Sequence, residues 1–357
     1  MTIPPASTLL NEMGERRIIR ELIEPRYDGV GDDCAAFGRD QVITTDSCGT
    51  ALVAGMGMDD PAHTGWLLAT INLSDLAAAG AEPEGLVVNY SLPPDTPVDT
   101  LKRIMDGVDA CATEHGTRVL GGDIGEGREL RLSATAVGRC PRRITAHGPV
   151  GTRLSRRGAR VGDHLLLIGS PGYLWGAALL HHGFATLPDE DRDVVYERAC
   201  RPRAQLRAGR ALAAKGLARA AIDVSDGLFA AVRGLCAANG LGADVRPHLD
   251  LDPVLDEVCR DAGVDPFQLG QTWGDWCLLV AVRPREVDLV RRLLPGRDPG
   301  VRDLGVLTAA PDRIRLVDGT AEPRLWDGID QERFSSTSWR GDGVVAALDH
   351  MRELSGV

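Results

Sequence analysis

Short runs rich in Val, Ile and Leu alternate with longer segments of helical character through both halves of this 357-residue sequence. Such alternation is typical of α/β and α+β domains, in which helices cover the faces of a sheet. The chain is long enough for two domains, each with its own hydrophobic core. We place the boundary near residue 150, which divides the chain into residues 1–150 and 151–357.

Individual elements follow from the spacing of apolar residues and from helix start and stop signals. The segment from Asp60 to Gly80 is the clearest helix, because an aspartate followed by Pro61 is a typical start and the glycine is a typical stop. The other predicted helices span residues 12–23, 99–115, 173–182, 204–215, 225–239 and 285–294. Strands are predicted at residues 41–45, 86–92, 118–120, 130–138, 164–168, 221–222 and 276–282.

Charge and composition exclude several function classes. The net charge of −11 disfavours nucleic acid as a partner, because such a chain gains no affinity from releasing counterions. The sequence has neither a signal peptide pattern nor an apolar stretch long enough to cross a bilayer. Its eight cysteines form no C-x-x-C pair, which favours reduced, buried thiols. We therefore expect a cytoplasmic protein without a membrane partner.

Aspartates recur in short segments beside the predicted strands and helices, usually next to Gly, Ser or Thr. These segments are Gly31-Asp32-Asp33, Thr44-Thr45-Asp46, Asn72-Leu73-Ser74-Asp75, Gly121-Gly122-Asp123 and Asp223-Val224-Ser225-Asp226-Gly227. Any one of them could be an ordinary helix cap or turn. Asp75 is harder to explain in this way, because it lies inside an apolar helical pattern with Ile71 and Leu76, where a carboxylate has no capping use.

Aspartates grouped in this way are suited to binding magnesium and a nucleotide. Mg²⁺ takes oxygen ligands and is usually held by one or two carboxylates while phosphates fill its other positions. Without cations, clustered aspartates would repel ATP, and bridging cations turn this repulsion into attraction. The pattern therefore predicts an ATP site with several Mg²⁺ ions.

The same segments carry a family resemblance. The closest matches to family motifs are Gly31-Asp32-Asp33-Cys34-Ala35, the run from Asn72 to Ala81, and the run from Ile222 to Leu228. Over roughly residues 28–330, the sequence resembles the thiamine-monophosphate kinase branch of the aminoimidazole ribonucleotide synthetase (PurM-like) superfamily.

This resemblance implies an α+β N-terminal domain that binds ATP and magnesium and an α/β C-terminal domain. It also implies a homodimer in which two N-terminal domains pair into a β-barrel. The implied magnesium ligands are Asp33, Thr44, Thr45, Asp46, Asp75, Asp123, Asp223 and Asp226, and we expect catalysis to depend most on Asp75 and Asp226. The implied ATP contacts are Gly122, Asp123, Arg156 and Ser225. Family kinases transfer the phosphoryl group in line, without a protein nucleophile.

Arg156 has two interpretations. It lies in Leu154-Ser155-Arg156-Arg157-Gly158-Ala159, which resembles a family link that contacts ATP. The forked donors of an arginine suit phosphate oxygens. The alternative is a solvated basic linker between the domains.

The acceptor side of the pocket departs from the family pattern. A family histidine-phenylalanine pair has no counterpart in the run from Ser47 to Gly55. In Thr272-Trp273-Gly274-Asp275-Trp276-Cys277, Asp275 is retained, but Gly274 and Cys277 replace two family glutamates, and Ile329 replaces an aromatic before Asp330. Asp275, Trp276 and Trp326, together with Trp273, are candidates for lining a pocket for a flatter or more apolar acceptor than thiamine monophosphate. The alternative for each tryptophan is ordinary core packing.

Three functions remain open at this point. The first is a Mg²⁺-dependent kinase whose small acceptor, phosphorylated or not, need not be thiamine monophosphate. The second is an ATP-dependent cyclase or C–N bond-forming enzyme that activates an amide or carboxylate oxygen in a specialised biosynthetic pathway. The third is an inactive nucleotide-binding partner subunit, against which the retained acids argue, because buried acids without a metal are costly.

Overall fold

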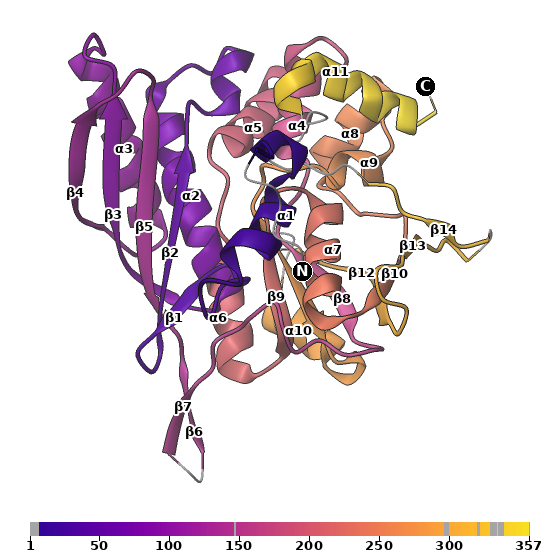
Figure 1. Cartoon of the computed structure of the whole chain (residues 1–357). Coiled ribbons are helices and arrows are strands. Elements are labelled where there is room, and N and C mark those ends of the chain that lie inside the picture. Colours follow the sequence, from indigo (N-terminus) through magenta and orange to yellow (C-terminus); the bar gives the residue numbers. More distant parts are fainter. Residues whose placement is uncertain are drawn as a thin grey trace.

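A computed structural model describes residues 7–145, 148–295, 300–319, 322–328, 334 and 339–356, and it shows two mixed sheets with helices packed on them. Figure 1 shows the two halves side by side, with the N-terminal sheet on the left and the C-terminal sheet on the right. The mixed α/β fold in two domains is confirmed. Among the described residues, no helix is both long enough and apolar enough to cross a membrane.

The N-terminal sheet has five strands in the order β1-β2-β5-β3-β4. Its strands are β1 (Ala35–Phe37), β2 (Gln41–Cys48), β3 (Glu82–Leu92), β4 (Val119–Glu126) and β5 (Arg131–Arg139). Only the β3–β4 pair is parallel; the other pairs are antiparallel. Helices α2 (Pro61–Ala78) and α3 (Val98–Glu114) lie behind the sheet in Figure 1 and share one hydrophobic core with it.

Helix α2 lies between the two domains. The Asp60 carboxylate accepts a hydrogen bond from the Ala62 amide at 2.9 Å, as an N-cap should, and Pro61 occupies the first turn. The helix is buried on nearly all sides, because it packs against α3 and its own sheet as well as against strands of the second domain. It packs closely against α3, since a Cβ atom on Gly65 would lie 1.9 Å from the Ile104 carbonyl oxygen.

The C-terminal sheet has seven strands in the order β14-β13-β10-β12-β8-β11-β9. They are β8 (His164–Ile168), β9 (Ala218–Val224), β10 (Gly242–Val245), β11 (Cys277–Val282), β12 (Val301–Thr308), β13 (Ile314–Leu316) and β14 (Arg324–Leu325). Side chains of β8 alternate between two cores: Leu165 and Leu167 face one side, and Leu166 and Ile168 face the other. Helices therefore cover both faces of this sheet.

The first core contains α4 (Tyr173–His181), α5 (Asp189–Cys200), α7 (Leu228–Asn239), α8 (Pro253–Ala262), α9 (Pro266–Gly270) and α11 (Trp339–Leu354). The second contains α6 (Leu206–Lys215) and α10 (Val287–Leu293). Smaller elements are η1 (Leu10–Glu12), α1 (Glu15–Ile18), η2 (Ile19–Ile23), η3 (Leu52–Met56) and η4 (Pro284–Glu286). Along the chain, a hairpin of β6 (Arg142–Thr145) and β7 (Gly148–Gly151) follows the first domain and projects at the bottom of Figure 1.

The structure also corrects details of the element predictions. The strand predicted at residues 118–120 is longer than expected, because β4 continues through Gly121-Gly122-Asp123 to Glu126. Helix α7 begins at Leu228 rather than Ser225, since Gly227 has a φ of 95° and ends a turn. Helices α5 and α8 and strand β12 were not predicted.

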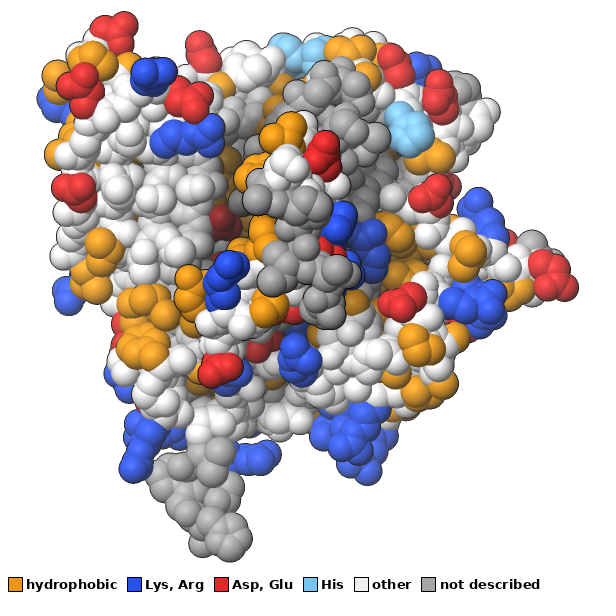
Figure 2. Space-filling model, in the orientation of Figure 1, with side chains coloured by type: hydrophobic (Ala, Val, Ile, Leu, Met, Phe, Trp, Pro, Cys, Tyr) orange, Lys and Arg blue, Asp and Glu red, His pale blue; other side chains and the backbone are white. Residues whose placement is uncertain are grey.

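Lys and Arg side chains gather along the lower edge of the molecule in Figure 2, although the net charge is −11.

Candidate active site

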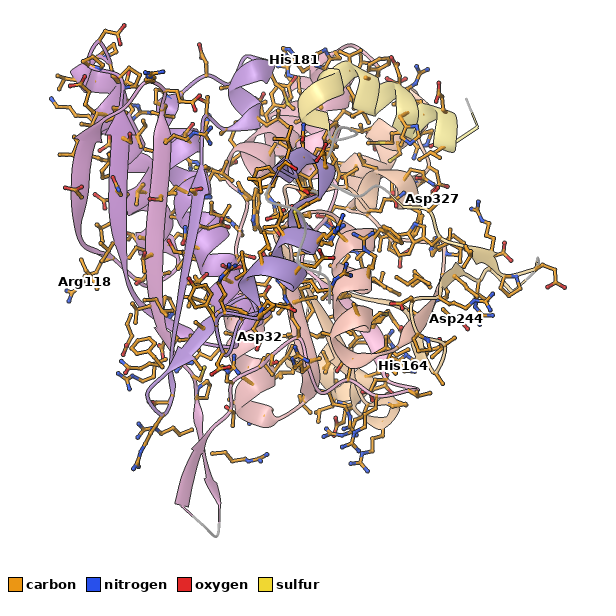
Figure 3. All side chains as sticks on the ribbon, in the orientation of Figure 1. Asp32, Arg118, His164, His181, Asp244 and Asp327 are labelled. Carbon is orange, nitrogen blue, oxygen red and sulfur yellow. The ribbon has the colours of Figure 1, made fainter. Side chains whose placement is uncertain are left out.

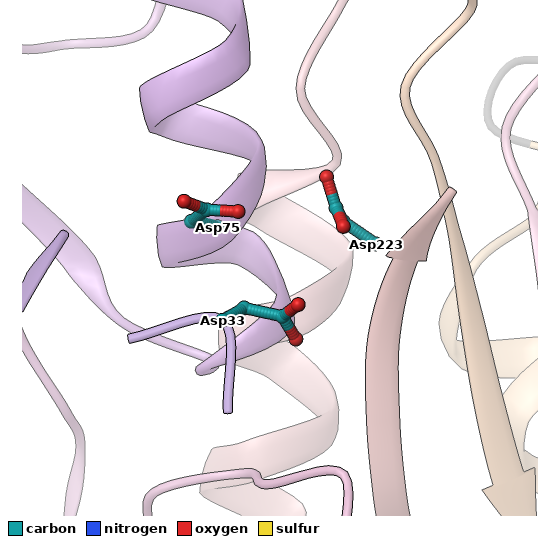
Figure 4. A group of neighbouring side chains, drawn as sticks. All are labelled: Asp33, Asp75 and Asp223. Carbon is teal, nitrogen blue, oxygen red and sulfur yellow. The ribbon is translucent and has the colours of Figure 1, made fainter. Parts of the chain in front are cut away.

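Three aspartates from distant parts of the chain meet between the two domains. Asp33 comes from the loop before β1, Asp75 from the interior of α2, and Asp223 from the end of β9. One carboxylate oxygen of each lies within 4.8 Å of the corresponding oxygen of the other two. Figure 4 shows the three side chains directed toward a common point. Two elements of the first domain and one of the second therefore build a single acidic cluster.

Hydrogen bonds fix the position of each carboxylate. Thr44 on β2 donates from its hydroxyl to Asp75 at 2.5 Å. The hydroxyls of Ser74 and Ser225 donate to the two oxygens of Asp223 at 3.2 and 3.4 Å. These contacts leave little freedom for the acidic side chains to move apart.

The cluster holds its carboxylates in an unfavourable electrostatic setting. Burial raises the pKa of Asp223 to about 8, and the nearby Asp33 charge adds to the shift. Burial, followed by the charges of Asp223 and Asp33, raises the pKa of Asp75 well above its ordinary value. Burial also raises the pKa of Asp33, although Arg156 opposes the shift. Like charges placed together away from water favour the protonated acids until a cation joins them.

This donor set fits a divalent cation. The ligand atoms are all oxygens, which suits a hard ion such as Mg²⁺ better than a soft metal that prefers sulfur. A cation between the three carboxylates would relieve the repulsion that raises their pKa values. Asp33, Asp75 and Asp223 are therefore the residues that would hold it first.

Arg156 supplies a positive charge to the same cluster. Its guanidinium hydrogen-bonds to Asp33, with Nε 3.1 Å from the carboxylate oxygen. Burial alone would lower the pKa of Arg156, but the Asp33 charge more than offsets this and raises it. The guanidinium therefore stays charged beside the acids, rather than extending into solvent as a basic linker would.

Asp32 holds the segment that carries Arg156. Its carboxylate accepts hydrogen bonds from Arg153 at 3.0 Å, from the Ser155 hydroxyl at 2.9 Å and from the Arg156 amide at 2.8 Å. Asp32 lies where the two domains meet (Figure 3). The second aspartate of the Gly-Asp-Asp motif thus enters the cluster, while the first ties the interdomain link to it.

A cavity of about 440 Å³ opens beside the cluster. The predicted residues that line it are Asp33, Thr44, Thr45, Asp46, Asp75, Arg156, Asp223, Ser225, Asp226 and Trp276, with Trp273 as a further tryptophan. The structure thus brings all of the predicted metal ligands except Asp123 to one cavity. The roles assigned to them by resemblance stay predictions.

Trp276 lines the cavity from a strained position. Its φ of 46° is in the left-handed region, which is unusual for a bulky residue. Strain of this kind costs on the order of 1–3 kcal/mol and is typical of functional sites. Gly274, two residues before it, has a φ of 103°, at which a glutamate would be strained, and a Cβ atom there would lie 2.1 Å from a methyl carbon of Leu174, which would have to shift.

Gly122 and Asp123 do not line this cavity. They lie on β4, an exposed edge strand, and β5 and β3 separate β4 from β2. Three strand spacings of about 4.8 Å place β4 roughly 14 Å from β2. Within one chain, Asp123 therefore does not join the acidic cluster.

Asp275 and Trp326, which were predicted to contact the acceptor, do not line the cavity either. The Asp275 carboxylate is buried at the start of α4, where it accepts hydrogen bonds from the amides of Gly172, Tyr173 and Leu174 at 2.7, 3.1 and 3.2 Å. Burial raises the pKa of Asp275 to about 6 despite these bonds. Trp326 is buried in the second domain, 5.1 Å from the Phe229 ring between centroids, which is core packing. Ile329 and Asp330 lie outside the described residues.

Sequence reasoning missed the residues that shape the apolar part of the cavity. His63, Leu67 and Ile71 line it from α2, and each is four residues from the next, ending at Asp75. Spacing of i and i+4 places side chains on one face of a helix. This spacing was visible in the sequence, but an all-round buried helix does not reveal which face lines a cavity.

Two protein-family descriptions match the chain. Residues 31–140 match "AIR synthase related protein, N-terminal domain", and residues 160–317 match "AIR synthase related protein, C-terminal domain". Together they cover both sheets except β14.

Two curated relatives of the chain carry the same name. The chain is 33% identical over 246 residues to "Thiamine-monophosphate kinase" of Escherichia coli (strain K12), covering 67% of this chain and 70% of that protein. It is 31% identical over 313 residues to the protein of the same name from Halobacterium salinarum, covering 86% and 97%.

Solved structures show the same fold. "AaThiL complexed with AMPPCP and TMP" superposes with a TM-score of 0.74 at 22% identity, covering 90% of this chain and 99% of that one. Thiamine-monophosphate kinase from Stenotrophomonas maltophilia K279a superposes with a TM-score of 0.65 at 27% identity, covering 86% and 96%.

Proposed function

This chain belongs to the AIR synthase related proteins and, within them, to the thiamine-monophosphate kinase family, and from this premise we propose that it transfers the terminal phosphoryl group of ATP to a small acceptor with the help of Mg²⁺. An ATP-using, kinase-like enzyme is what its relatives indicate. The transfer to a small acceptor and the magnesium requirement are the parts that this proposal adds.

One observation carries the proposal: Asp33, Asp75 and Asp223 converge within 4.8 Å at the end of a cavity large enough for a small molecule. When bound there, Mg²⁺ would join carboxylates to phosphate oxygens and offset their charge. The protein would supply position and charge, as in family kinases, which transfer the phosphoryl group without a protein nucleophile.

The polar and charged residues that line the cavity have two proposed roles. We assign Asp33, Asp75 and Asp223 as metal ligands, with Thr44, Thr45, Asp46 and Asp226 completing the set. Arg156 and Ser225 would contact phosphate, because a guanidinium fork matches two phosphate oxygens. Asp75 and Asp226 are the residues on which turnover would depend most.

The proposed transfer breaks one P–O bond and forms another. The bond between the γ-phosphorus of ATP and its bridging oxygen breaks, and its electron pair stays on ADP. A new P–O bond forms to an oxygen of the acceptor, whose proton, if present, passes to solvent. For a phosphorylated acceptor the products are ADP and a diphosphate.

Product analysis tests the proposal. Purified protein is incubated with ATP, Mg²⁺ and a panel of small acceptors that includes thiamine monophosphate. ADP together with a phosphorylated acceptor supports the kinase. Inorganic phosphate with a dehydrated or cyclised product supports the cyclase or C–N bond-forming alternative. Tight ATP binding without turnover on any acceptor supports the inactive partner subunit.

We further propose that two N-terminal domains pair through their sheets. Val87 on β3 is 44% exposed, and Leu120 and Ile124 on β4 are 53% and 61% exposed. Figure 2 shows hydrophobic side chains scattered over this sheet. Because side chains alternate along a strand, Val87 and the exposed Asp123 lie on the outer face of the sheet, and Ile124 lies on the other face at its edge. A partner on the outer face would cover Val87 and Asp123, and light scattering that finds only monomer in solution would rule the pairing out.

A further inference from the structure

The long axis of the cavity runs along α2. Three hydrogen bonds join this helix to β2 and to the segment after it, which run antiparallel to the helix: Thr44 to Asp75 at 2.5 Å, the Asp46 amide to Asn72 at 3.0 Å, and the Ala51 amide to Thr64 at 3.0 Å. The two walls therefore run side by side, from the aspartate cluster at one end to His63 at the other.

The residues of α2 that line the cavity indicate how long a ligand beside them can be. Leu67, Ile71 and Asp75 line it from one face of the helix. At 1.5 Å per residue, Leu67 lies roughly 12 Å from Asp75 along the helix axis, and Ile71 lies about halfway. A ligand with its reacting group at Asp75 thus has room for a body about two rings long beside these two side chains.

The surroundings of that body are apolar. Leu52, Val53, Leu174 and Trp273 also line the cavity, and they belong to, or pack against, the large core of the second domain. Trp276 lines it from the other side, where it packs with Leu67 against the core of the first domain. Besides its aspartates and Arg156, the described lining contains one further carboxylate and one imidazole, those of Glu15 and His63.

We propose that the acceptor of this enzyme presents its reacting group to the Asp75 end and a neutral, apolar ring system along Ile71, Leu67, Trp273 and Trp276, so that thiamine monophosphate, with its cationic thiazolium ring, is a poor substrate. This inference rests on the proposed function, since it concerns the acceptor of the same transfer. It adds the chemical class of that acceptor.

The attraction between the tryptophan rings and a cation is too weak to reverse the preference for a neutral ligand. A cation over an indole face gains a modest attraction. Taking a cation from water into an apolar part of a pocket costs more than that attraction returns, unless a carboxylate pairs with it there. Trp273 is also buried against Trp175, with the two ring centroids 4.3 Å apart, so much of its surface is already covered. A neutral ring gains the burial without the desolvation cost.

A matched pair of ligands tests the inference. One is thiamine monophosphate, and the other is its analogue in which a neutral thiophene ring replaces the thiazolium ring, with the same shape and phosphate. Binding of each is measured by calorimetry with the full chain, Mg²⁺ and a non-hydrolysable ATP analogue. We expect the neutral ligand to bind at least tenfold more tightly. Equal or tighter binding of thiamine monophosphate, or failure of both ligands to bind, overturns the inference.

Substitutions at Leu67 and Glu15 test which residues set the preference between the two ligands. Leu67→Glu places a carboxylate at the apolar end of the cavity on an existing helix, and Leu67→Gln is the control of equal size without the charge. The glutamate should shift the preference toward the cationic ligand at least threefold relative to the glutamine. Glu15→Gln should leave the preference unchanged, whereas a selective loss of thiamine monophosphate binding would show that Glu15 already serves as a counter-ion and would overturn the inference.

The outcomes separate the two proposals. The preference between the ligands is judged from binding alone, and the proposed function is judged from formation of ADP with a phosphorylated product. If the neutral ligand binds better but neither ligand is phosphorylated, the acceptor class stands and the kinase proposal fails. If thiamine monophosphate binds better and is phosphorylated, the kinase stands and the acceptor class fails.

Discussion

The hydroxyl of Thr44 donates a 2.5 Å hydrogen bond to the carboxylate of Asp75, across the contact between β2 and α2. This bond explains an acid in the middle of a buried apolar helix. The charge faces a polar strand on one side and two other carboxylates on the other. The helix tolerates this acid because its partners come from other elements.

Asp75→Asn tests the metal assignment directly. The amide keeps the shape of the carboxylate but removes its charge, so Mg²⁺ loses a ligand. We expect turnover to fall more than about 100-fold, beyond what a change in the residues around a metal ligand usually costs. The fold should persist, and the free energy of unfolding should stay equal or rise on the order of 1 kcal/mol, since like charges are relieved. Unaltered turnover in a steady-state assay would show that the metal assignment is wrong.

Thr44→Val removes the hydroxyl and keeps the side-chain volume. The Asp75 carboxylate then lacks a donor that orients it, and the apparent affinity for Mg²⁺ should fall roughly 10- to 100-fold. Thr44→Ser keeps the hydroxyl and is the matched control. Titration of activity against Mg²⁺ concentration measures the effect, and equal curves for the valine and serine variants would contradict it.

The fold was predictable where local signals agree. The Asp60 cap, the proline and Gly80 delimited α2 correctly, and the apolar run from His164 to Ile168 is β8 as predicted. Helix α5 escaped prediction because its first turn is three consecutive acids and few of its residues are buried. Strand β12 escaped because Arg302 and Asp303 interrupt its apolar run, and they are tolerated through contacts with residues far away in sequence.

The candidate site was predictable in its residues more than in its arrangement. Asp33, Asp75 and Asp223 each lie in a short motif that can be read locally, and the structure brings them together. Asp123 lies in a similar motif but on an edge strand, and strand order is not written in any local segment. Asp275 was placed with the acceptor, yet its direction depends on where α4 begins in space.

Arg156→Lys separates the charge of this residue from its fork of donors. Lysine keeps the positive charge, but a single ammonium cannot match two phosphate oxygens in the same way. We expect the KM for ATP to rise roughly tenfold in the lysine variant and more in Arg156→Gln, in line with a lost charged hydrogen bond. The backbone amide that binds Asp32 is unchanged in both variants. An unchanged KM for ATP in both would favour a structural role for Arg156.

The pKa of Asp223 predicts a pH dependence of stability. Its folded value of about 8 lies above the ordinary 3.8, so between these values the folded protein keeps a proton that the unfolded chain has released. Raising the pH therefore favours unfolding, and the stability of the metal-free protein should fall from about pH 4 to about pH 8 and then level off. Thermal unfolding in a chelator measures this, and Asp223→Asn should flatten the slope.

Magnesium should reverse that trend. Its binding requires deprotonated carboxylates, so the affinity should rise as pH approaches 8, by up to about tenfold per unit for each proton displaced. The stabilisation by added Mg²⁺ should accordingly be larger at pH 8 than at pH 6. Stabilisation by Mg²⁺ that does not depend on pH would contradict a site built from these acids.

Asp275→Asn distinguishes a helix cap from an acceptor ligand. The carboxylate accepts hydrogen bonds from three amides at the start of α4, and an asparagine would turn its own amide group toward at least one of them. One buried amide then loses its acceptor, which should lower the free energy of unfolding by about 1–3 kcal/mol. The KM for ATP should change less than about twofold, because the carboxylate does not reach the cavity. Urea unfolding and steady-state kinetics measure both effects. A variant that keeps full stability but loses acceptor binding selectively would return Asp275 to the acceptor site, since only a ligand contact would then account for the loss.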